Sequence, residues 1–232
     1  MNAFDVMVTN IVTIQDDASV EEAAWLMLQD GISALPVVDR RGALIGIATA
    51  EDFRRRARDG TGTFSLRNVG SDARKVSEVM TREIITVSED ASLENVATAM
   101  DRHGVRHVVV MRGGTLVGMI DRGNLRQAQA TMPSRAVAEA DREIRQEIIA
   151  EFEALAWMPS ASVNPIVWDG VVHLHGCVRH ERERAALKFI AKCPPGVVDV
   201  EDHLVQVEPY PYMTFRGPAR FCPDRDAYVG CA

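Results

Sequence analysis

Residues 6–31 read VMVTNIVTIQDDASVEEAAWLMLQDG, and residues 79–104 read VMTREIITVSEDASLENVATAMDRHG. The second stretch repeats the first without a gap, so that Met7 aligns with Met80 and Gly31 with Gly104. Repetition of this kind indicates one supersecondary unit that is used twice, each copy covering apolar surface that the other cannot bury alone. Two such copies bring equivalent clefts together, which suits binding better than chemistry.

The repeat continues as GISALPVVDRRGALIGIATAED (31–52) and GVRHVVVMRGGTLVGMIDRGN (104–124). Each copy begins with an apolar strand (11–14, 84–87), and a Ser then caps a helix whose apolar residues recur at helical spacing. The Gly that ends each quoted helix is the expected left-handed terminator. Two short strands joined by a turn containing Gly follow, and a second helix starts at Thr49 or Asp121. The unit is therefore β-α-β-β-α, twice.

A different pattern starts at Asp141, which opens a helix with one apolar stripe. An Asp-Gly turn joins strands 163–168 and 171–178 into a hairpin, a helix follows at 181–193, and 197–207 reads as a last strand. The sequence thus predicts an α/β (α+β) chain with two repeats, at 1–60 and 76–130, and a small α/β domain at 141–208. Linkers are expected at 61–75 and 131–140, and an irregular tail at 209–232.

Composition limits the partners of the chain. A net charge of -7 disfavours a nucleic-acid backbone, because phosphates need a basic face. We find neither an apolar run that could span a bilayer nor a secretion signal, so a cytoplasmic protein is expected. All four cysteines lie in the last quarter at spacings that fit no zinc or redox motif, and free thiols are expected. The Arg run that begins at Arg54 reads as the solvated end of a helix or as a phosphate patch.

Both quoted stretches resemble the CBS domain, and together they resemble a tandem CBS pair, the Bateman module. The resemblance includes the Val-Met opening, the Asp-Ala-Ser cap and the Leu-x-Gly close, over roughly residues 1–130. Residues from about Asp141 to Val207 resemble the BON domain, a module that contacts phospholipid or protein. The motif that carries this resemblance is WDGVVHLHGCVRHERERAALKFIAKCPPGVVDVEDHLVQV (168–207). Bateman modules bind adenosine-containing ligands between their copies, and they usually associate in pairs.

The resemblance implies a ligand site in the first copy. Thr49, at a helix start, would donate to phosphate, and Asp52, one turn later on the same face, would hold the ribose diol. The base would lie against Ile11, Val12, Ala34 and Pro36. Without a ligand, Thr49 is equally explained as a helix cap, and Asp52 as an acid that complements the helix dipole.

The second copy departs from this pattern. Asp121 stands in place of Thr49 and repels phosphate, while Asn124 replaces Asp52 and is a weaker acceptor for a diol. This half-site, with Ile84 and Ile85 as its walls, is expected to be empty or altered. In some relatives basic residues at the position of Arg106-His107 contact phosphate, although this pair also reads as surface residues beside a strand.

His173, His175 and Cys177 alternate along one strand and point to one face, which makes them a conceivable transition-metal triad. Positions along one strand diverge, however, and a tetrahedral site needs ligands that converge. We therefore favour the alternative that these three residues form the exposed face of the hairpin, whereas Leu174 and Val178 on the opposite face are buried. No catalytic constellation is found, so an enzyme is not expected.

The sequence, together with the resemblance, predicts a non-catalytic regulatory module. AMP, ADP, ATP or S-adenosylmethionine would bind between the repeats, and the BON-like domain would pass the signal to a membrane surface or a partner protein. A homodimer through the apolar helix faces 20–28 and 93–100 is expected. Two alternatives stay open: a CBS dimerisation scaffold that binds no ligand, and, less favoured, a metal-dependent enzyme using the His173 face.

Overall fold

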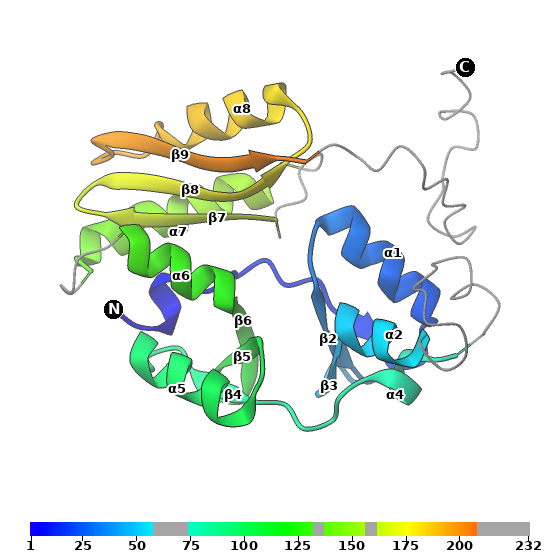
Figure 1. The fold of residues 1–232 in the computed structure, drawn as a ribbon. Helices are drawn as coiled ribbons and strands as arrows, with labels where there is room; N and C mark the ends of the chain where they lie inside the picture. Colours follow the sequence, from blue (N-terminus) through cyan, green and yellow to red (C-terminus); the bar gives the residue numbers. More distant parts are fainter. Residues whose placement is uncertain (58–73, 132–136, 156–161, 208–232) are drawn as a thin grey trace, which may run out of the picture.

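The computed structural model describes residues 1–57, 74–131, 137–155 and 162–207 (Figure 1). Within these ranges the chain is a mixed α/β protein with three separate three-stranded sheets. Among the described helices we find no membrane-span candidate, since none combines the length and the hydropathy that such a span needs. Much of the Arg-rich linker and the whole tail from residue 208 lie outside the described residues, so the expectations for them are not addressed.

The first repeat has the predicted order of elements. These are β1 (Ile14–Gln15), α1 (Val20–Asp30), β2 (Ala34–Val38), β3 (Leu44–Thr49) and α2 (Ala50–Ala57). Ser19 caps α1 by accepting a hydrogen bond from the Glu22 amide, and Gly31 ends the helix at φ +64°. The sheet has the order β1-β2-β3, with β1 parallel to β2 and β2 antiparallel to β3.

The second repeat reproduces the first. It contains a short helix α4 (Val76–Val79), β4 (Thr86–Ser88), α5 (Leu93–His103), β5 (His107–Arg112), β6 (Thr115–Asp121) and α6 (Arg122–Thr131). Ser92 caps α5 and Gly104 ends it at φ +65°. In both repeats the first strand is shorter than predicted, because residues 11–13 and 84–85 are not part of a strand. Ile85 nevertheless accepts a hydrogen bond from the amide of Val109.

The opening segment of each repeat is bonded to and packs against the other repeat. The 3-10 helix η1 (Ala3–Asp5) bonds to the second copy, and Val8 exchanges two backbone hydrogen bonds with Met119 of β6. Thr81 makes the same exchange with Ile47 of β3. A Cβ on Gly118 or Gly46 would lie only 2.3 Å or 2.5 Å from the Sδ of Met7 or Met80, so a side chain at either glycine would prevent this approach. The duplicated Met positions therefore fasten the two repeats together.

The third unit is one sheet with two helices on one face. Its elements are α7 (Glu139–Glu153), β7 (Val163–Trp168), β8 (Val171–Val178), α8 (Glu181–Ala191) and β9 (Asp199–Gln206), and β9 runs parallel to β8. Asp141 lies inside α7 rather than opening it, and its carboxylate accepts the amides of Asp169 and Gly170 in the hairpin turn. Both turn residues have positive φ, as an Asp-Gly turn of type I′ requires.

The other face of this third sheet packs on the second repeat. Ile166 is fully buried in the core of the second repeat, and Trp168 packs against the same core. The helix α6 lies beside β7 in Figure 1. This packing corrects the expectation that His173 and His175 form an exposed face, because they are only 7% and 6% exposed. Leu174 and Val178 are buried on the helix side as expected.

Arg145 of α7 joins the third unit to the repeats. Arg145 is 2% exposed, and its guanidinium donates to the carbonyl oxygens of Pro165 (2.9 Å) and Met7 (2.6 Å) and to Asn164 Oδ1 (3.2 Å). Burial lowers the pKa of Arg145 to about 10, although nearby Asp5 opposes this effect. The side chain therefore stays charged at neutral pH and binds two backbone carbonyls, one of the opening segment and one of β7.

The change Arg145→Ala should lower the free energy of unfolding by about 3–5 kcal/mol, because three buried oxygen atoms lose this donor and each such loss costs roughly 1–3 kcal/mol. Urea unfolding measures this loss. Arg102→Ala, at an exposed position in α5, is the control and should change stability by less than about 0.5 kcal/mol. Equal effects of the two changes would contradict this role of Arg145.

Candidate functional site

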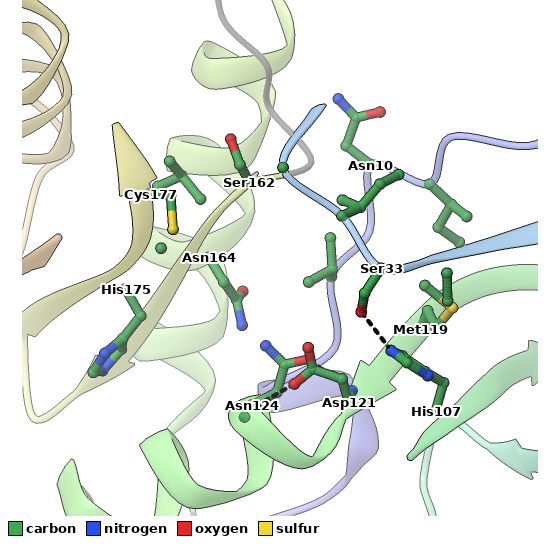
Figure 2. A pocket seen from close by; sticks show the side chains of 18 of the residues that line it. Asn10, Ser33, His107, Met119, Asp121, Asn124, Ser162, Asn164, His175 and Cys177 are labelled. Carbon is green, nitrogen blue, oxygen red and sulfur yellow. Dashed lines mark hydrogen bonds between the residues drawn. The ribbon is translucent and has the colours of Figure 1, made fainter. Parts of the chain in front are cut away.

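A cavity of about 200 Å³ lies where both repeats and the third unit meet (Figure 2). The first repeat contributes the segment before β1 and the turn before β2, and the second contributes the start of β5 and the junction of β6 with α6. The hairpin of β7 and β8 closes the third side. The described lining residues are Val8, Asn10, Ile11, Val12, Gly31, Ile32, Ser33, Ala34, His107, Met119, Asp121, Gly123, Asn124, Gln127, Ser162, Val163, Asn164, His175, Gly176 and Cys177.

Half of the residues expected from the sequence meet in this cavity. Among the described lining residues are Ile11, Val12, Ala34, His107, Asp121 and Asn124, but not Pro36, Thr49, Asp52, Ile84, Ile85 or Arg106. The segment before the first strand therefore meets the helix start of the second copy and not that of its own copy. The exchange of opening segments explains this pairing, because Val8 is bonded to Met119 of the second repeat just before the chain continues to β1.

Thr49 and Asp52 are bonded to each other at the start of α2. The Thr49 hydroxyl donates to Asp52 Oδ2 at 2.7 Å, and the Asp52 amide donates to Thr49 Oγ1 at 3.2 Å. The Thr49 amide also donates to Asp52 Oδ2, at 2.9 Å. These contacts are those of a helix cap, so both side chains are explained in this structure without a ligand.

Asp121 and Asn124 make the same cap in the second copy, at the cavity wall. The Asp121 amide donates to Asn124 Oδ1 at 2.9 Å, and the Asn124 amide donates to Asp121 Oδ1 at 2.7 Å. This exchange fixes a carboxylate and a carboxamide side by side beside the cavity (Figure 2). A carboxylate accepts hydroxyl hydrogen bonds, and a carboxamide both donates and accepts.

His107 spans the boundary between the two repeats. Its Nε2 lies 3.0 Å from the hydroxyl of Ser33, so the starts of β5 and β2 are linked at the cavity (Figure 2). Burial lowers the pKa of His107; Asp121 raises it and Arg106 lowers it further. The imidazole is therefore neutral at pH 7 and can either donate or accept a hydrogen bond.

The third unit supplies Asn164, His175 and Cys177 to the cavity wall. Asn164 is held in place by its Nδ2 atom, which donates to the carbonyl of Val6 at 2.9 Å. His175 is buried, and its Nε2 finds no hydrogen-bond partner in the described part of the chain. Burial, followed by His203 and His173, lowers the pKa of His175 to about 4. These residues belong to a unit that sequence reasoning had placed apart from the ligand.

The chemistry of the wall is apolar and amide-rich. Val8, Ile11, Val12, Ile32, Met119 and Val163 supply apolar surface, and three asparagines supply hydrogen bonds. Asp121 adds a negative charge, and the described lining residues include no Lys or Arg. Such a cavity suits a flat base and a hydroxylated sugar better than a chain of phosphates.

Comparisons with known proteins place most of the chain in two families. A CBS-domain model matches residues 3–59 and 76–131, and a BON-domain model matches residues 140–208. The CBS domain-containing protein YhcV of Bacillus subtilis is 31% identical over 137 residues, which are 58% of this chain and 89% of that protein. An uncharacterized conserved protein from Pyrococcus horikoshii superposes with a TM-score of 0.50 at 24% identity, over 58% of this chain and 96% of that one.

Other relatives are longer proteins. A homoserine O-acetyltransferase of Methanococcoides burtonii is 31% identical over 118 residues, which are 50% of this chain but 22% of that enzyme. This chain spans only 22–37% of the length of that relative and two other archaeal ones. The similarity therefore concerns a segment of those proteins.

The lowered pKa of His107 predicts a loss of stability in acid. The unfolded chain binds a proton near the ordinary histidine value of 6.5, whereas the folded chain binds it only at lower pH. Stability should therefore fall as the pH drops below that value, and His107→Gln should weaken the fall. Urea unfolding of both proteins at about pH 7.5 and about pH 5.5 brackets the ordinary value and measures the difference. Parallel losses in the two proteins would contradict the prediction.

Proposed function

Since the chain belongs to the CBS-domain family and carries a BON domain after its two CBS repeats, we propose that it is a non-catalytic regulatory protein that binds an adenosine-containing ligand. The ligand occupies the cavity between the repeats, and the BON domain responds to it. The observation that carries this proposal is the lining of the cavity, to which both repeats and the BON hairpin contribute.

The base of the ligand lies against the apolar wall formed by Ile11, Val12 and Met119. The ribose hydroxyls donate to the carboxylate of Asp121, with the carboxamide of Asn124 beside it. A volume of about 200 Å³ is below the roughly 300–1,000 Å³ of most small-molecule pockets, so it holds a nucleoside while the rest of the ligand points outward.

The negative charge of the cavity favours some candidate ligands over others. Asp121 repels phosphate, and the described lining residues offer no Lys or Arg to neutralise it. S-adenosylmethionine, whose sulfonium and ammonium groups are cationic, suits Asp121 best. AMP and ADP come next, and ATP is the least favoured of the four.

Ligand binding reaches the BON domain through shared walls. Asn164 lines the cavity and also bonds to Val6 and to Arg145, so a ligand that contacts Asn164 acts on the joint between the domains. A ligand shifts the relative placement of two domains only when it binds one placement more tightly than another. A ligand that contacts both the repeats and the BON domain has this difference in affinity.

The BON domain passes the signal on by contacting a membrane surface or a partner protein. Its exposed apolar side chains, Phe189, Val198 and Val205, are the candidates for this contact. The exposed Leu28 on α1 belongs to one of the faces proposed for a homodimer. A cytoplasmic location is part of the same proposal.

A CBS scaffold that binds no ligand is the second candidate. The observation that favours it is the pair of closed caps, Thr49 with Asp52 and Asp121 with Asn124, which account for all four side chains without a ligand. This candidate predicts that no adenosine compound changes the stability of the protein.

A thermal-shift screen separates the two functions. At a concentration one hundred times its dissociation constant, a ligand of the folded state should raise Tm by roughly 5–10 °C. S-adenosylmethionine, AMP, ADP and ATP are the compounds to compare, and the first should act at the lowest concentration. No shift with any of the four would support the scaffold.

Variants test where the ligand binds. Ser33→Phe fills the cavity from an exposed position and should abolish the shift, whereas Ser88→Phe, at an exposed position of β4, is a matched control that should keep it. Asp52→Asn should also keep it. A shift that is lost in Asp52→Asn and kept in Ser33→Phe would place the ligand at Thr49 and Asp52 instead.

A further inference from the structure

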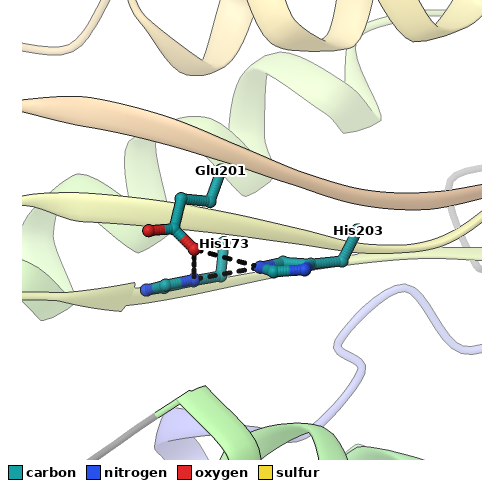
Figure 3. A group of neighbouring side chains, drawn as sticks. All are labelled: His173, Glu201 and His203. Atoms are coloured by element: carbon teal, nitrogen blue, oxygen red, sulfur yellow. Dashed lines mark hydrogen bonds and ion pairs between the residues drawn. The ribbon is translucent and has the colours of Figure 1, made fainter.

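His173, Glu201 and His203 form a compact group on the BON sheet, which we name the His–Glu–His cluster (Figure 3). His173 lies on β8, and the other two residues lie on the parallel neighbour β9. The register pairs His173 with Glu201 and His175 with His203. The cluster thus draws ligands from two strands, which lets them converge as ligands along a single strand do not.

The three ligand atoms lie at the corners of a small triangle. His173 Nδ1 is 3.2 Å from His203 Nε2 and 3.2 Å from Glu201 Oε2, and His203 Nε2 is 3.4 Å from the same oxygen. In a tetrahedral zinc site with bonds of about 2.0–2.1 Å, two ligand atoms are about 3.3–3.4 Å apart. The triangle therefore already has the edges of a tetrahedral face.

The cluster is buried at His173 and exposed to solvent at the other two residues. The His173 side chain is 8% exposed, whereas those of His203 and Glu201 are 37% and 53% exposed. The His203 ring stacks on the buried His175, with centroids 4.5 Å apart and planes 9° apart. One ligand is thus fixed in the protein, the second is supported by a stacked ring, and solvent can supply a fourth ligand.

We propose that the His–Glu–His cluster binds a divalent transition metal, and that Zn²⁺ fits it best. Two imidazole nitrogens and one carboxylate oxygen form a donor set that suits zinc and its neighbours, whereas Ca²⁺ and Mg²⁺ prefer oxygen ligands alone. Three protein ligands and one open position are the arrangement of a zinc ion that keeps a water molecule.

This site differs from the triad that the sequence suggested. His173 is common to both, but Glu201 and His203 replace His175 and Cys177, and Cys177 lines the ligand cavity instead. The metal would tie β9 to β8 across the chain segment that contains α8. The bound ion therefore stabilises the BON fold, since metal binding to a folded site is itself folding free energy.

The test is a zinc titration of the full chain after removal of metal with a chelator, in competition with a chromophoric chelator. The proposal predicts one zinc per chain and a rise in Tm on binding. His203→Ala and Glu201→Gln should each weaken binding more than roughly 100-fold, because loss of residues that only support a metal ligand already costs about 10–100-fold.

Two controls keep the test specific. Cys177→Ser removes a member of the triad suggested by the sequence, and His103→Ala removes an exposed histidine of α5; both should keep the wild-type affinity. Circular dichroism of His203→Ala and Glu201→Gln checks their folding. The absence of stoichiometric zinc, unchanged affinity in both cluster variants, or loss of binding in Cys177→Ser would overturn the proposal.

Discussion

The buried guanidinium of Arg145 is the contact on which the arrangement of the whole molecule depends. It binds the carbonyls of Met7 and Pro165 at the same time, and so ties the opening segment of the chain to the BON hairpin. Met7 in turn packs against Gly118 of the second repeat, where a larger residue would not fit. One charged side chain thus sets the position of the BON sheet relative to the second repeat, and this placement closes the cavity.

The shared cavity gives the CBS pair and the BON domain a common surface. Asn164, His175 and Cys177 would contact the same ligand as Ile11 and Asp121. His175 also stacks on His203 of the proposed metal cluster, so the cavity and the cluster are neighbours on one face of the sheet. Linkage then requires that any effect of the ligand on the metal is matched by an equal effect of the metal on the ligand.

Local rules predicted most of the elements but not their exchange between repeats. The Ser caps, the Gly terminators and the Asp-Gly turn need only neighbouring residues, and they lie where the sequence placed them. The exchange of opening segments depends on contacts between Val8 and Met119 and between Thr81 and Ile47, which are distant in sequence. Sequence reasoning therefore grouped Ile11 and Val12 with Asp52, whereas in the structure they line one cavity with Asp121.

The metal cluster shows the same limit of sequence reasoning. Alternation along 197–207 places Glu201 and His203 on one face of a strand, but only the parallel register of β9 on β8 brings them to His173.

The proposed function depends most on one ligand that touches both repeats and the BON hairpin. Amide chemical shifts of the labelled protein, measured during addition of S-adenosylmethionine, test it directly. The account predicts concerted shifts at Ser33, Asp121 and Cys177; shifts confined to the region of Thr49 and Asp52 would contradict it.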